Sequence, residues 1–347
     1  MTAEQIQDRI RGSLIGGAAG DALGYPLEFV NGLRILSQYG EDGLAYYILS
    51  NNGKALISDD TQMTLFTACG ILNSASTGLP TLDTITYAYV EWYYTQTDGK
   101  RHKGFKNCWV GDIPEMNARR APGKTCMGAL QSISHGREWV NDSKGCGGVM
   151  RIAPIPLYGA VDNHWSVEAT DKLAADASEI THQHRMGYIP SAFIAHVIYR
   201  LVQTDNPTKQ NLEDIIGEAT EAISKMYGDC EPLLSLIRRA VALSNLPVSK
   251  EEAYEHYLGE GWVAEETAAI AIYCSLKHFD DFGKALSAAV SHGGDSDSTG
   301  AVTGNILGAA IGYDAIPAKF KANLELHDVI LHVADDLYRG HTTPFNK

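Results

Sequence analysis

Hydrophobic residues recur at intervals of three and four along most of the chain, which is the spacing of one buried face of an α-helix. Turn signals such as Asn206 followed by Pro207 separate these stretches, and no long polar linker lies between them. The sequence shows no low-complexity segment and no solenoid-type repeat. The periodicity predicts helices over 4–18, 61–72, 83–94, 166–180, 189–202, 211–226, 231–243, 263–276, 282–291, 298–311 and 326–338.

The alternation that is typical of β-strands is scarce. The best candidate strand is the short stretch "LAYYIL" at 44–49. The pattern as a whole therefore predicts an all-α fold, a compact helical bundle that forms a single domain over 1–347.

Glycines recur at every fourth position in two of the predicted helices. The early set is Gly12, Gly16, Gly20 and Gly24, and the late set is Gly300, Gly304, Gly308 and Gly312. A glycine inside a helix costs about 1 kcal/mol relative to alanine, so these ridges need a reason. A ridge without side chains lets another helix approach closely. Either the two ridges pack on each other or each packs elsewhere; antiparallel packing would bring Asp295 and Asp297 beside Asp21 and Glu28.

The net charge limits the classes of molecule that the protein is expected to bind. The formal net charge is −14 and the sequence pI is about 5.3, which argues against a nucleic acid or an anionic membrane as partner. The most basic runs, "GKRHKGFK" at 99–106 and "NARR" at 117–120, are short. No apolar run reaches 18 residues, and the first residues lack the pattern of a signal peptide. The six cysteines form no C-x-x-C pair, so reduced thiols and a cytoplasmic location are expected.

Two acidic clusters stand at predicted helix starts. One is "SDDT" at 58–61 and the other is "DSDST" at 295–299. A helix cap alone explains one such residue at each start, because Ser and Asp are preferred caps and acids suit the first turn. Each cluster offers more oxygen atoms than a cap uses, and hard divalent cations bind several oxygen ligands. Together with Glu28, the clusters favour a metal site over simple capping.

Five segments of the chain resemble, in order, the motifs of the ADP-ribosylglycohydrolase family. They are "GSLIGGAAGDALGYPLEF" (12–29), "SDDTQMTL" (58–65), "GGVMRIAPIPL" (147–157), "ITHQH" (180–184) and "GGDSDSTGAVTGNILGA" (293–309). The resemblance spans about 12–312. It implies a compact all-α fold with two Mg²⁺ or Mn²⁺ ions. It also implies hydrolysis of the glycosidic bond between ADP-ribose and a protein side chain, which makes an ADP-ribosylated protein the substrate and ADP-ribose the product.

The resemblance also implies roles for the acidic clusters. The implied metal ligands are Ser58, Asp59, Asp60, Asp295, Asp297 and Ser298. The family usually has threonine where this chain has Ser58 and Ser298, and serine keeps the oxygen ligand. Glu28 matches a glutamate that acts at the metal centre as ligand, base or gate. Asp21 either belongs to the site or orders the turn after the first helix.

A glycine-rich loop and a histidine are the implied binding residues for ADP-ribose. Successive glycines in "GCGGVMRIAP" (145–154) let backbone N–H groups approach a phosphate. The family match implies contacts from Gly147, Gly148, Val149 and Met150, and from His182 but not from His184. Many relatives have asparagine near Cys146. Arg151 is either a phosphate contact or a buried structural arginine paired with a carboxylate.

The segment "GDIPEMNARRAPGKTCMGAL" (111–130) resembles a family segment near the substrate ribose. Asp112 is its candidate acid for assisting departure of the leaving group. Asn117 and Arg120 in the same segment would only fix the loop. Tyr25 or Trp109 would stack on adenine, with core packing as the alternative for both.

The implied chemistry is metal-assisted. Cleavage builds positive charge on the ribose, and a poor leaving group needs protonation or electrostatic help. Two cations would bind the ribose hydroxyls and orient a water, whose proton goes to Glu28, Asp60 or Asp297. Arginine is the expected acceptor side chain, ahead of serine or O-acetyl-ADP-ribose. The alternatives are a metal-dependent ADP-ribose-binding module without turnover and a two-metal phosphohydrolase that acts on a free nucleotide.

Overall fold

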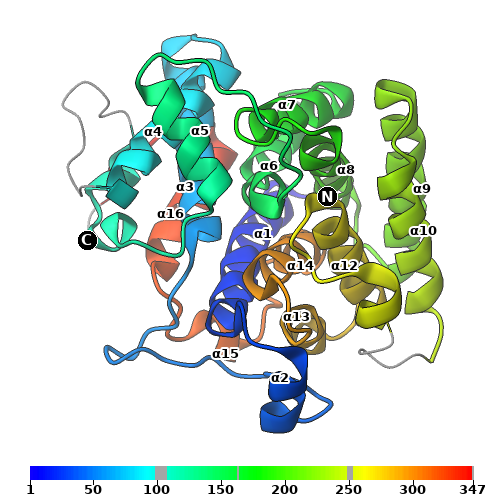
Figure 1. Cartoon of the computed structure of the whole chain (residues 1–347). Helices are drawn as coiled ribbons and strands as arrows, with labels where there is room; N and C mark the ends of the chain where they lie inside the picture. The colour runs from blue at the N-terminus through cyan, green and yellow to red at the C-terminus, as the bar shows by residue number, and fades with distance from the viewer. Residues whose placement is uncertain (98–107, 162–163, 248–252, 346–347) are drawn as a thin grey trace.

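Two helices, α1 (Ala3–Gly24) and α14 (Ser296–Ile311), lie side by side near the centre of the molecule (Figure 1). Their glycine ridges face each other, so that a Cβ atom added to Gly16 would lie 2.3 Å from the carbonyl oxygen of Gly304. Gly12 meets Gly308 and Gly20 meets Gly300 in the same way, which makes the two helices antiparallel. The packing of the two ridges on each other is therefore confirmed.

The computed structural model describes residues 1–97, 108–161, 164–247 and 253–345. Every helix predicted from periodicity is present within these ranges. Besides α1 and α14, they are α3 (Asp59–Thr77), α4 (Thr81–Thr97), α7 (Val167–Glu179), α8 (Arg185–Gln203), α9 (Lys209–Tyr227), α10 (Glu231–Ser244), α12 (Ala264–Lys277), α13 (Phe282–Val290) and α16 (His327–Arg339).

Several short elements were not predicted. The helices among them are α2 (Gly32–Tyr39), α5 (Lys124–Ser134), α6 (Pro154–Ala160) and α15 (Ala318–Lys321). The others are the 3-10 turns η1 (Tyr25–Leu27), η2 (Trp109–Asp112), η3 (Pro114–Asn117) and η4 (Cys146–Arg151), and the π-helical turn η6 (Tyr254–Leu258). Most of the segments that border the candidate site are among these short elements and the loops beside them.

One continuous hydrophobic core joins the described helices. Trp92 of α4, Phe66 of α3 and Phe193 of α8 are fully buried in it. Helices α4 and α5 stand at one side of the bundle and α9 and α10 at the other, with α1 and α14 between them (Figure 1). This arrangement confirms the all-α bundle. In the described part of the chain, no helix has the length and apolar character needed to cross a membrane.

The predicted strand at 44–49 is wrong. This segment is a loop with a bend at Tyr46, and most of its residues are at least partly exposed. The Tyr47 hydroxyl donates to the carbonyl oxygen of Phe320 at 2.8 Å, and the Lys319 ammonium donates to that of Ala45 at 3.1 Å. The loop therefore meets α15 and its flanks through side chains instead of forming a ladder, and the described residues contain only isolated bridges. The basic run at 99–106 lies outside the described residues.

Candidate functional site

Asp21, at the end of α1, holds the start of α3. Its carboxylate is fully buried and accepts hydrogen bonds from the backbone N–H groups of Ser58 at 2.9 Å and Thr61 at 3.1 Å. The Thr61 hydroxyl also donates to it. Burial raises the pKa of Asp21 to about 6. Asp21 thus orders the turn that presents the first acidic cluster, which is the structural role considered for it.

The first acidic cluster opens α3. Ser58 is the N-cap, and its hydroxyl accepts from the Asp60 N–H at 3.2 Å. Asp59 accepts from the Gly123 N–H at 3.3 Å, while the Oδ2 atom of Asp60 is buried and has no hydrogen-bond partner. Burial and the nearby carboxylates of Asp21 and Asp59 raise the pKa of Asp60 well above its usual value. Asp59 and Asp60 line a cleft, whereas Ser58 lies outside its lining.

The second acidic cluster opens α14 on the opposite side of the same cleft. Asp295 caps the helix by accepting from the Ser298 N–H at 3.3 Å, and Asp297 accepts from the same group at 3.1 Å. Burial and the carboxylates of Asp60 and Asp295 raise the pKa of Asp297 well above its usual value. Asp295, Asp297 and Ser298 all line the cleft. The glycine contacts between α1 and α14 therefore bring the two acidic clusters together.

Glu28 joins these carboxylates from the loop that follows η1. It is half-buried and lines the cleft, and burial together with the charge of Asp295 raises its pKa to about 8. Phe29, the next residue, has a φ of 65°, which non-glycine residues rarely adopt. The structure therefore places every predicted carboxylate of the metal site, and Glu28, around one cleft.

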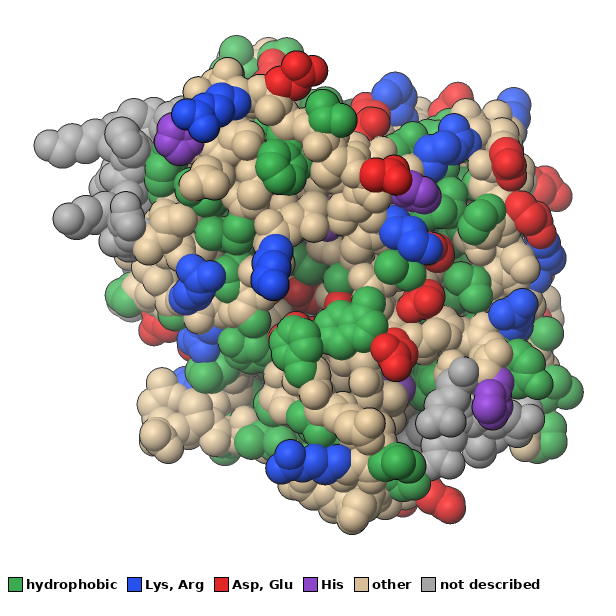
Figure 2. Space-filling model, in the orientation of Figure 1, with side chains coloured by type: hydrophobic (Ala, Val, Ile, Leu, Met, Phe, Trp, Pro, Cys, Tyr) green, Lys and Arg blue, Asp and Glu red, His purple; other side chains and the backbone are tan. Residues whose placement is uncertain are grey.

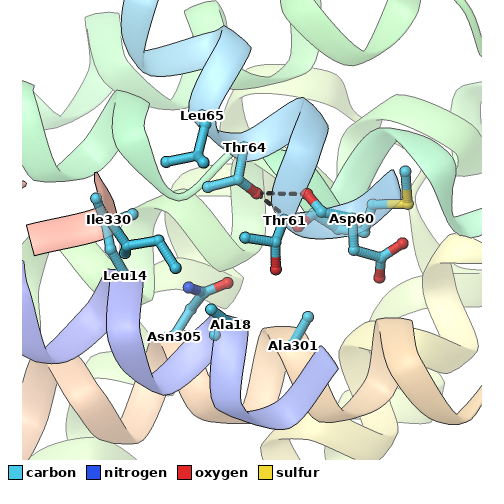
Figure 3. A pocket seen from close by; sticks show the side chains of 11 residues that line it. Leu14, Ala18, Asp60, Thr61, Thr64, Leu65, Ala301, Asn305 and Ile330 are labelled. Carbon is cyan, nitrogen blue, oxygen red and sulfur yellow. Dashed lines mark hydrogen bonds between the residues drawn. The ribbon is translucent and has the colours of Figure 1, made fainter. Parts of the chain in front are cut away.

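The cleft has a volume of about 380 Å³, within the range of sites for small ligands. Figure 2 shows a hollow on this face with acidic side chains at its floor and hydrophobic side chains beside it. Below the carboxylates, a cavity of about 10 Å³ lies between α1, α3, α14 and α16, with room for about one water. Figure 3 shows this cavity, with the Thr64 hydroxyl donating to the backbone carbonyl of Asp60 at 2.8 Å.

The carboxylates are the residues that would hold a metal ion. Within the described ranges, no three His, Cys, Asp or Glu side chains already stand as a formed metal-binding group. The chemistry of the donors nevertheless fits a hard divalent cation, because carboxylate and hydroxyl oxygens predominate. The unpartnered Oδ2 atom of Asp60 fits it as well. Cys146 adds a softer neighbour, since its thiol donates to Asp295 Oδ2 at 2.7 Å.

The glycine-rich loop contributes only part of what was predicted. Gly147 and Met150 line the cleft, but Gly148 and Val149 do not. Val149 is buried in the core, and Gly148 is packed so closely on Gly187 that a Cβ atom would lie 2.9 Å from its carbonyl oxygen. The glycine at 148 is therefore explained by helix packing. Gly148 and Val149 therefore do not line the cleft.

His182 lines the cleft beside Gly145 and Gly147. Burial, and then the positive charge of Arg151, lowers its pKa to about 3, so the ring is neutral at neutral pH. Arg151 donates to the Thr181 hydroxyl at 2.7 Å, and that hydroxyl is 2.8 Å from His182 Nδ1. The Thr181 hydroxyl also lies 3.4 Å from the carbonyl oxygen of Ser178, to which it donates. The other ring nitrogen of His182, Nε2, is close to Gly145 and Gly147.

Arg151 itself is structural. It is fully buried, with its guanidinium 4.2 Å from the centre of the Tyr89 ring and 3.2 Å from the carbonyl oxygen of Ala177. The predicted alternative of a buried arginine is thus correct in burial. Within the described part of the chain, however, its partners are a ring, a carbonyl, a hydroxyl and sulfur atoms in place of the predicted carboxylate. His184 caps α8 by accepting from the Met186 N–H.

Asp112 lies apart from the other predicted site residues. It is exposed and lines a different pocket, together with Trp109 and Phe345. The Trp109 ring stacks on Phe345 at 5.3 Å, which ties the η2 turn to the C-terminal segment and away from the acidic cleft. The structure thus gives Asp112 no place beside Glu28 and the aspartates.

The other polar and aromatic candidates have local roles. Asn117 donates to the carbonyl oxygens of Gly111 and Ile113, each at 2.9 Å, and so fixes its own loop. Arg120 forms an ion pair with Glu325 at 2.7 Å. Trp109 packs against the core, and Tyr25 is half-buried outside the lining of the cleft.

Sequence reasoning missed several residues that line the cleft. They are Phe29, Gly123, Lys124, Thr125, Cys126 and Trp262. The run Pro122-Gly123 before a helix-forming stretch was an available signal for the start of α5, whose N-terminus has no side-chain cap. No local pattern marks Phe29 or Trp262, because these rings come together only through the fold.

A family model described as ADP-ribosylglycohydrolase matches residues 2–346. The chain belongs to the ADP-ribosylglycohydrolase family. A solved structure titled "ADP-ribosylglycohydrolase-related protein complex" shares the fold, with a TM-score of 0.65, 23% identity, and coverage of 97% of this chain and 99% of the other. The resemblance seen in the five sequence segments is therefore confirmed.

Three characterised relatives carry hydrolase names. "ADP-ribosylhydrolase ARH3" of Homo sapiens is 27% identical over 57% of this chain and 58% of its own length, so the match spans little more than half of that relative. "ADP-ribosylarginine hydrolase Tri1" of Serratia proteamaculans is 25% identical over 95% of this chain and 79% of its own length. "ADP-ribosyl-[dinitrogen reductase] glycohydrolase" of Rhodospirillum rubrum is 23% identical, with coverage of 94% and 93%.

Proposed function

We propose that this protein is a divalent-metal-dependent hydrolase that releases ADP-ribose from arginine side chains of proteins, and thereby reverses mono-ADP-ribosylation. The observation that carries the proposal is the meeting of Asp59, Asp60, Asp295, Asp297 and Glu28 in one cleft. The family match and the hydrolase names of relatives support the reaction class.

The acidic end of the cleft is suited to the chemistry of the glycosidic bond. The four aspartates would hold two Mg²⁺ or Mn²⁺ ions, which supply electrostatic stabilisation and orient the reacting groups. The carboxylates also favour the positive charge that builds on the ribose as the bond breaks. Glu28, which is half-buried and lines the same cleft, would accept a proton from the attacking water, with Asp60 and Asp297 as the other candidates.

The other lining of the cleft suits an anionic diphosphate. The first turn of α5 brings Lys124 and uncapped backbone N–H groups to the cleft, and a helix N-terminus favours anions. His182 adds an imidazole ring that is neutral at neutral pH. Gly147 lets the loop pack against this ring, since a Cβ atom at 147 would lie 2.8 Å from it. ADP-ribose would therefore lie with its phosphates toward α5 and its terminal ribose toward the aspartates.

Arginine is the proposed acceptor on two grounds. The name of the Serratia relative, which aligns over most of this chain, specifies ADP-ribosylarginine. The acidic cleft also suits a cationic side chain better than a neutral hydroxyl. The proposed partners are thus an ADP-ribosylated protein as substrate and free ADP-ribose as product.

The test is release of free ADP-ribose from arginine-linked and serine-linked ADP-ribosyl peptides of the same sequence. Each peptide is incubated with the wild-type protein in Mg²⁺, in Mn²⁺ and in EDTA. The double variant Asp295→Ala/Asp297→Ala is compared with Asp214→Ala, which removes an exposed carboxylate on α9.

The proposal expects release from the arginine-linked peptide in Mg²⁺ or Mn²⁺, loss of release in EDTA and in the double variant, and full release by Asp214→Ala. Release from the serine-linked peptide alone would mean that the acceptor is serine and not arginine. Tight binding of ADP-ribose without release from either peptide would instead indicate a binding module. Formation of AMP or phosphate would indicate a phosphohydrolase.

A further inference from the structure

Two aromatic rings that the proposed reaction does not use stand at the acidic end of the cleft. Phe29 and Trp262 stack with their ring centres 5.2 Å apart and their planes 21° from parallel, and both line the cleft. Trp262 is half-buried, whereas the Phe29 side chain is 73% exposed. A phenylalanine in the left-handed region of φ is conformationally unfavourable. Such features concentrate where a ligand is bound.

The two segments that carry the rings are seated against the loop of the second acidic cluster. A Cβ atom on Gly293 would lie 2.3 Å from the backbone nitrogen of Gly32, and one on Gly294 would lie 1.9 Å from the carbonyl oxygen of Glu260. The two glycines that precede Asp295 therefore let the chain near Phe29 and the chain near Trp262 approach from either side. The ring pair is thus fixed at the acidic end of the cleft.

Further hydrogen bonds hold Trp262 in this place. Its carbonyl oxygen accepts from the Cys146 N–H at 3.2 Å, and the Asp295 N–H donates to the neighbouring Glu260 carbonyl at 2.8 Å. The indole N–H of Trp262 donates to the carboxylate of Glu260 at 3.0 Å. The Trp262 ring is therefore positioned by groups of both the glycine-rich loop and the metal-site loop.

Each ring is accompanied by a carboxylate. Glu28 precedes Phe29 in the chain, and the exposed Glu260 binds the Trp262 indole. Aromatic faces beside carboxylates make a site for a planar cation, because a guanidinium stacks on rings and pairs with acids at its edge. A neutral hydroxyl gains from neither contact.

We propose that Phe29 and Trp262, with Glu28 and Glu260, form the subsite that binds the arginine side chain of the substrate and so determine the acceptor. This inference rests on the proposed function, which puts the scissile bond at the aspartates. The acceptor side chain then leaves the cleft past the stacked rings. Its guanidinium stacks on the exposed Phe29 face while the terminal ribose is held at the aspartates.

The test separates the acceptor from the rest of the substrate. Values of kcat and KM are measured on an arginine-linked ADP-ribosyl peptide in Mg²⁺, and binding of free ADP-ribose is measured by calorimetry. The variants are Phe29→Leu and Trp262→Leu, which keep apolar bulk without a ring, and Phe29→Tyr, which restores a ring. Leu33→Ala, which truncates an exposed apolar side chain four residues from Phe29, is the control.

We expect Phe29→Leu to lower kcat/KM for the arginine-linked peptide by about three- to thirty-fold, mainly through KM. Affinity for free ADP-ribose stays unchanged, and Phe29→Tyr recovers most of the loss. Trp262→Leu acts in the same direction. Leu33→Ala leaves both measurements as in the wild type.

Three results would overturn the inference. Equal weakening of free ADP-ribose binding by Phe29→Leu would mean that the rings contact the ADP-ribose moiety. An unchanged KM with normal turnover would mean that they do not touch the substrate, and the proposed function would stand without them. Wild-type protein that releases nothing from the peptide would remove the proposed function and this inference together.

Discussion

One carboxylate oxygen of Asp60 is buried and accepts no hydrogen bond. Several other carboxylates line the same cleft. In the absence of a bound cation this arrangement lowers the stability of the folded protein, because like charges repel strongly where water is excluded. We expect Asp60→Asn to raise the free energy of unfolding in EDTA by on the order of 1 kcal/mol, because it removes a buried repulsive charge. The same change should abolish most of the thermal stabilisation that Mg²⁺ gives the wild type, because a ligand is lost.

Thermal melts of wild type, Asp60→Asn and Asp214→Asn in EDTA and in Mg²⁺ check this. The exposed Asp214 should give the wild-type result in both conditions. An Asp60→Asn protein that keeps the full Mg²⁺ effect would show that Asp60 is not a metal ligand.

His182 gives a pH dependence whose sign follows from its lowered pKa. The folded protein holds the ring neutral down to about pH 3, while the unfolded chain protonates it near pH 6.5. Below pH 6.5 the unfolded state therefore binds more protons, and stability is lost as the pH falls from 6.5 toward 3. Each unit in that window costs up to about 1.4 kcal/mol for this residue.

We expect His182→Asn to have a shallower loss of stability than the wild type between pH 6 and pH 4. Urea unfolding at several pH values measures the free energy of unfolding of both proteins. The difference between the two proteins at each pH isolates the contribution of His182 from that of the other titrating groups. His292, whose pKa is lowered to about 4 mainly by burial, should leave a remaining slope in the variant. Parallel stability curves for the two proteins would contradict the assignment.

Among elements, the pair α1 and α14 does most to position the site, and its glycines allow a direct test. A Cβ atom on Gly304 would lie 1.9 Å from the carbonyl oxygen of Gly16, so the helices must move apart to accept it. We expect Gly304→Ala to lower the free energy of unfolding by about 3 kcal/mol or more, since backbone cannot yield as a flexible side chain does. It should also weaken metal binding, because the two acidic clusters separate.

Gly217, in the middle of α9, is the matched control. Among the described residues, and apart from its chain neighbours and the nearby backbone of α9, no atom lies within 4 Å of a Cβ atom placed on it. Gly217→Ala should therefore stabilise the protein by about 1 kcal/mol through helix propensity alone. Chemical unfolding of the wild type and of both variants measures the two effects on stability. Equal effects at the two sites would mean that the contact between the glycine ridges is not tight.

The same elements show how far sequence reasoning reached. Periodicity predicted α9, α10 and α16 because each buries one side against the core. It also predicted α3 and α8, which are buried along most of their length. It missed α5, which buries only Cys126, Ala129 and Leu130. It also predicted a strand at 44–49, where the chain forms a loop that is held by contacts with residues distant in sequence, such as that of Tyr47 with Phe320. The aspartates were found through local chemistry, whereas the place of Asp112 and the meeting of Phe29 with Trp262 depend on packing between distant segments.

At the scale of the whole molecule, an acidic protein is proposed to bind an anionic product. The net charge is −14, and four aspartates line the same cleft as Lys124. Without cations these carboxylates repel the diphosphate of ADP-ribose, and with cations they attract it. We therefore expect Mg²⁺ to tighten ADP-ribose binding by about tenfold or more, and ADP-ribose to tighten Mg²⁺ binding by the same factor, as linkage requires.

Calorimetric titrations of ADP-ribose in EDTA and in Mg²⁺, and of Mg²⁺ with and without ADP-ribose, measure both sides of this coupling. The double variant Asp295→Ala/Asp297→Ala should lose the coupling and bind ADP-ribose in EDTA at least as well as the wild type, because repulsion is reduced. Asp214→Ala should behave as the wild type. If ADP-ribose binds equally well with and without Mg²⁺, the acidic clusters act on a different part of the reaction, and the phosphates are held by α5 and His182 alone.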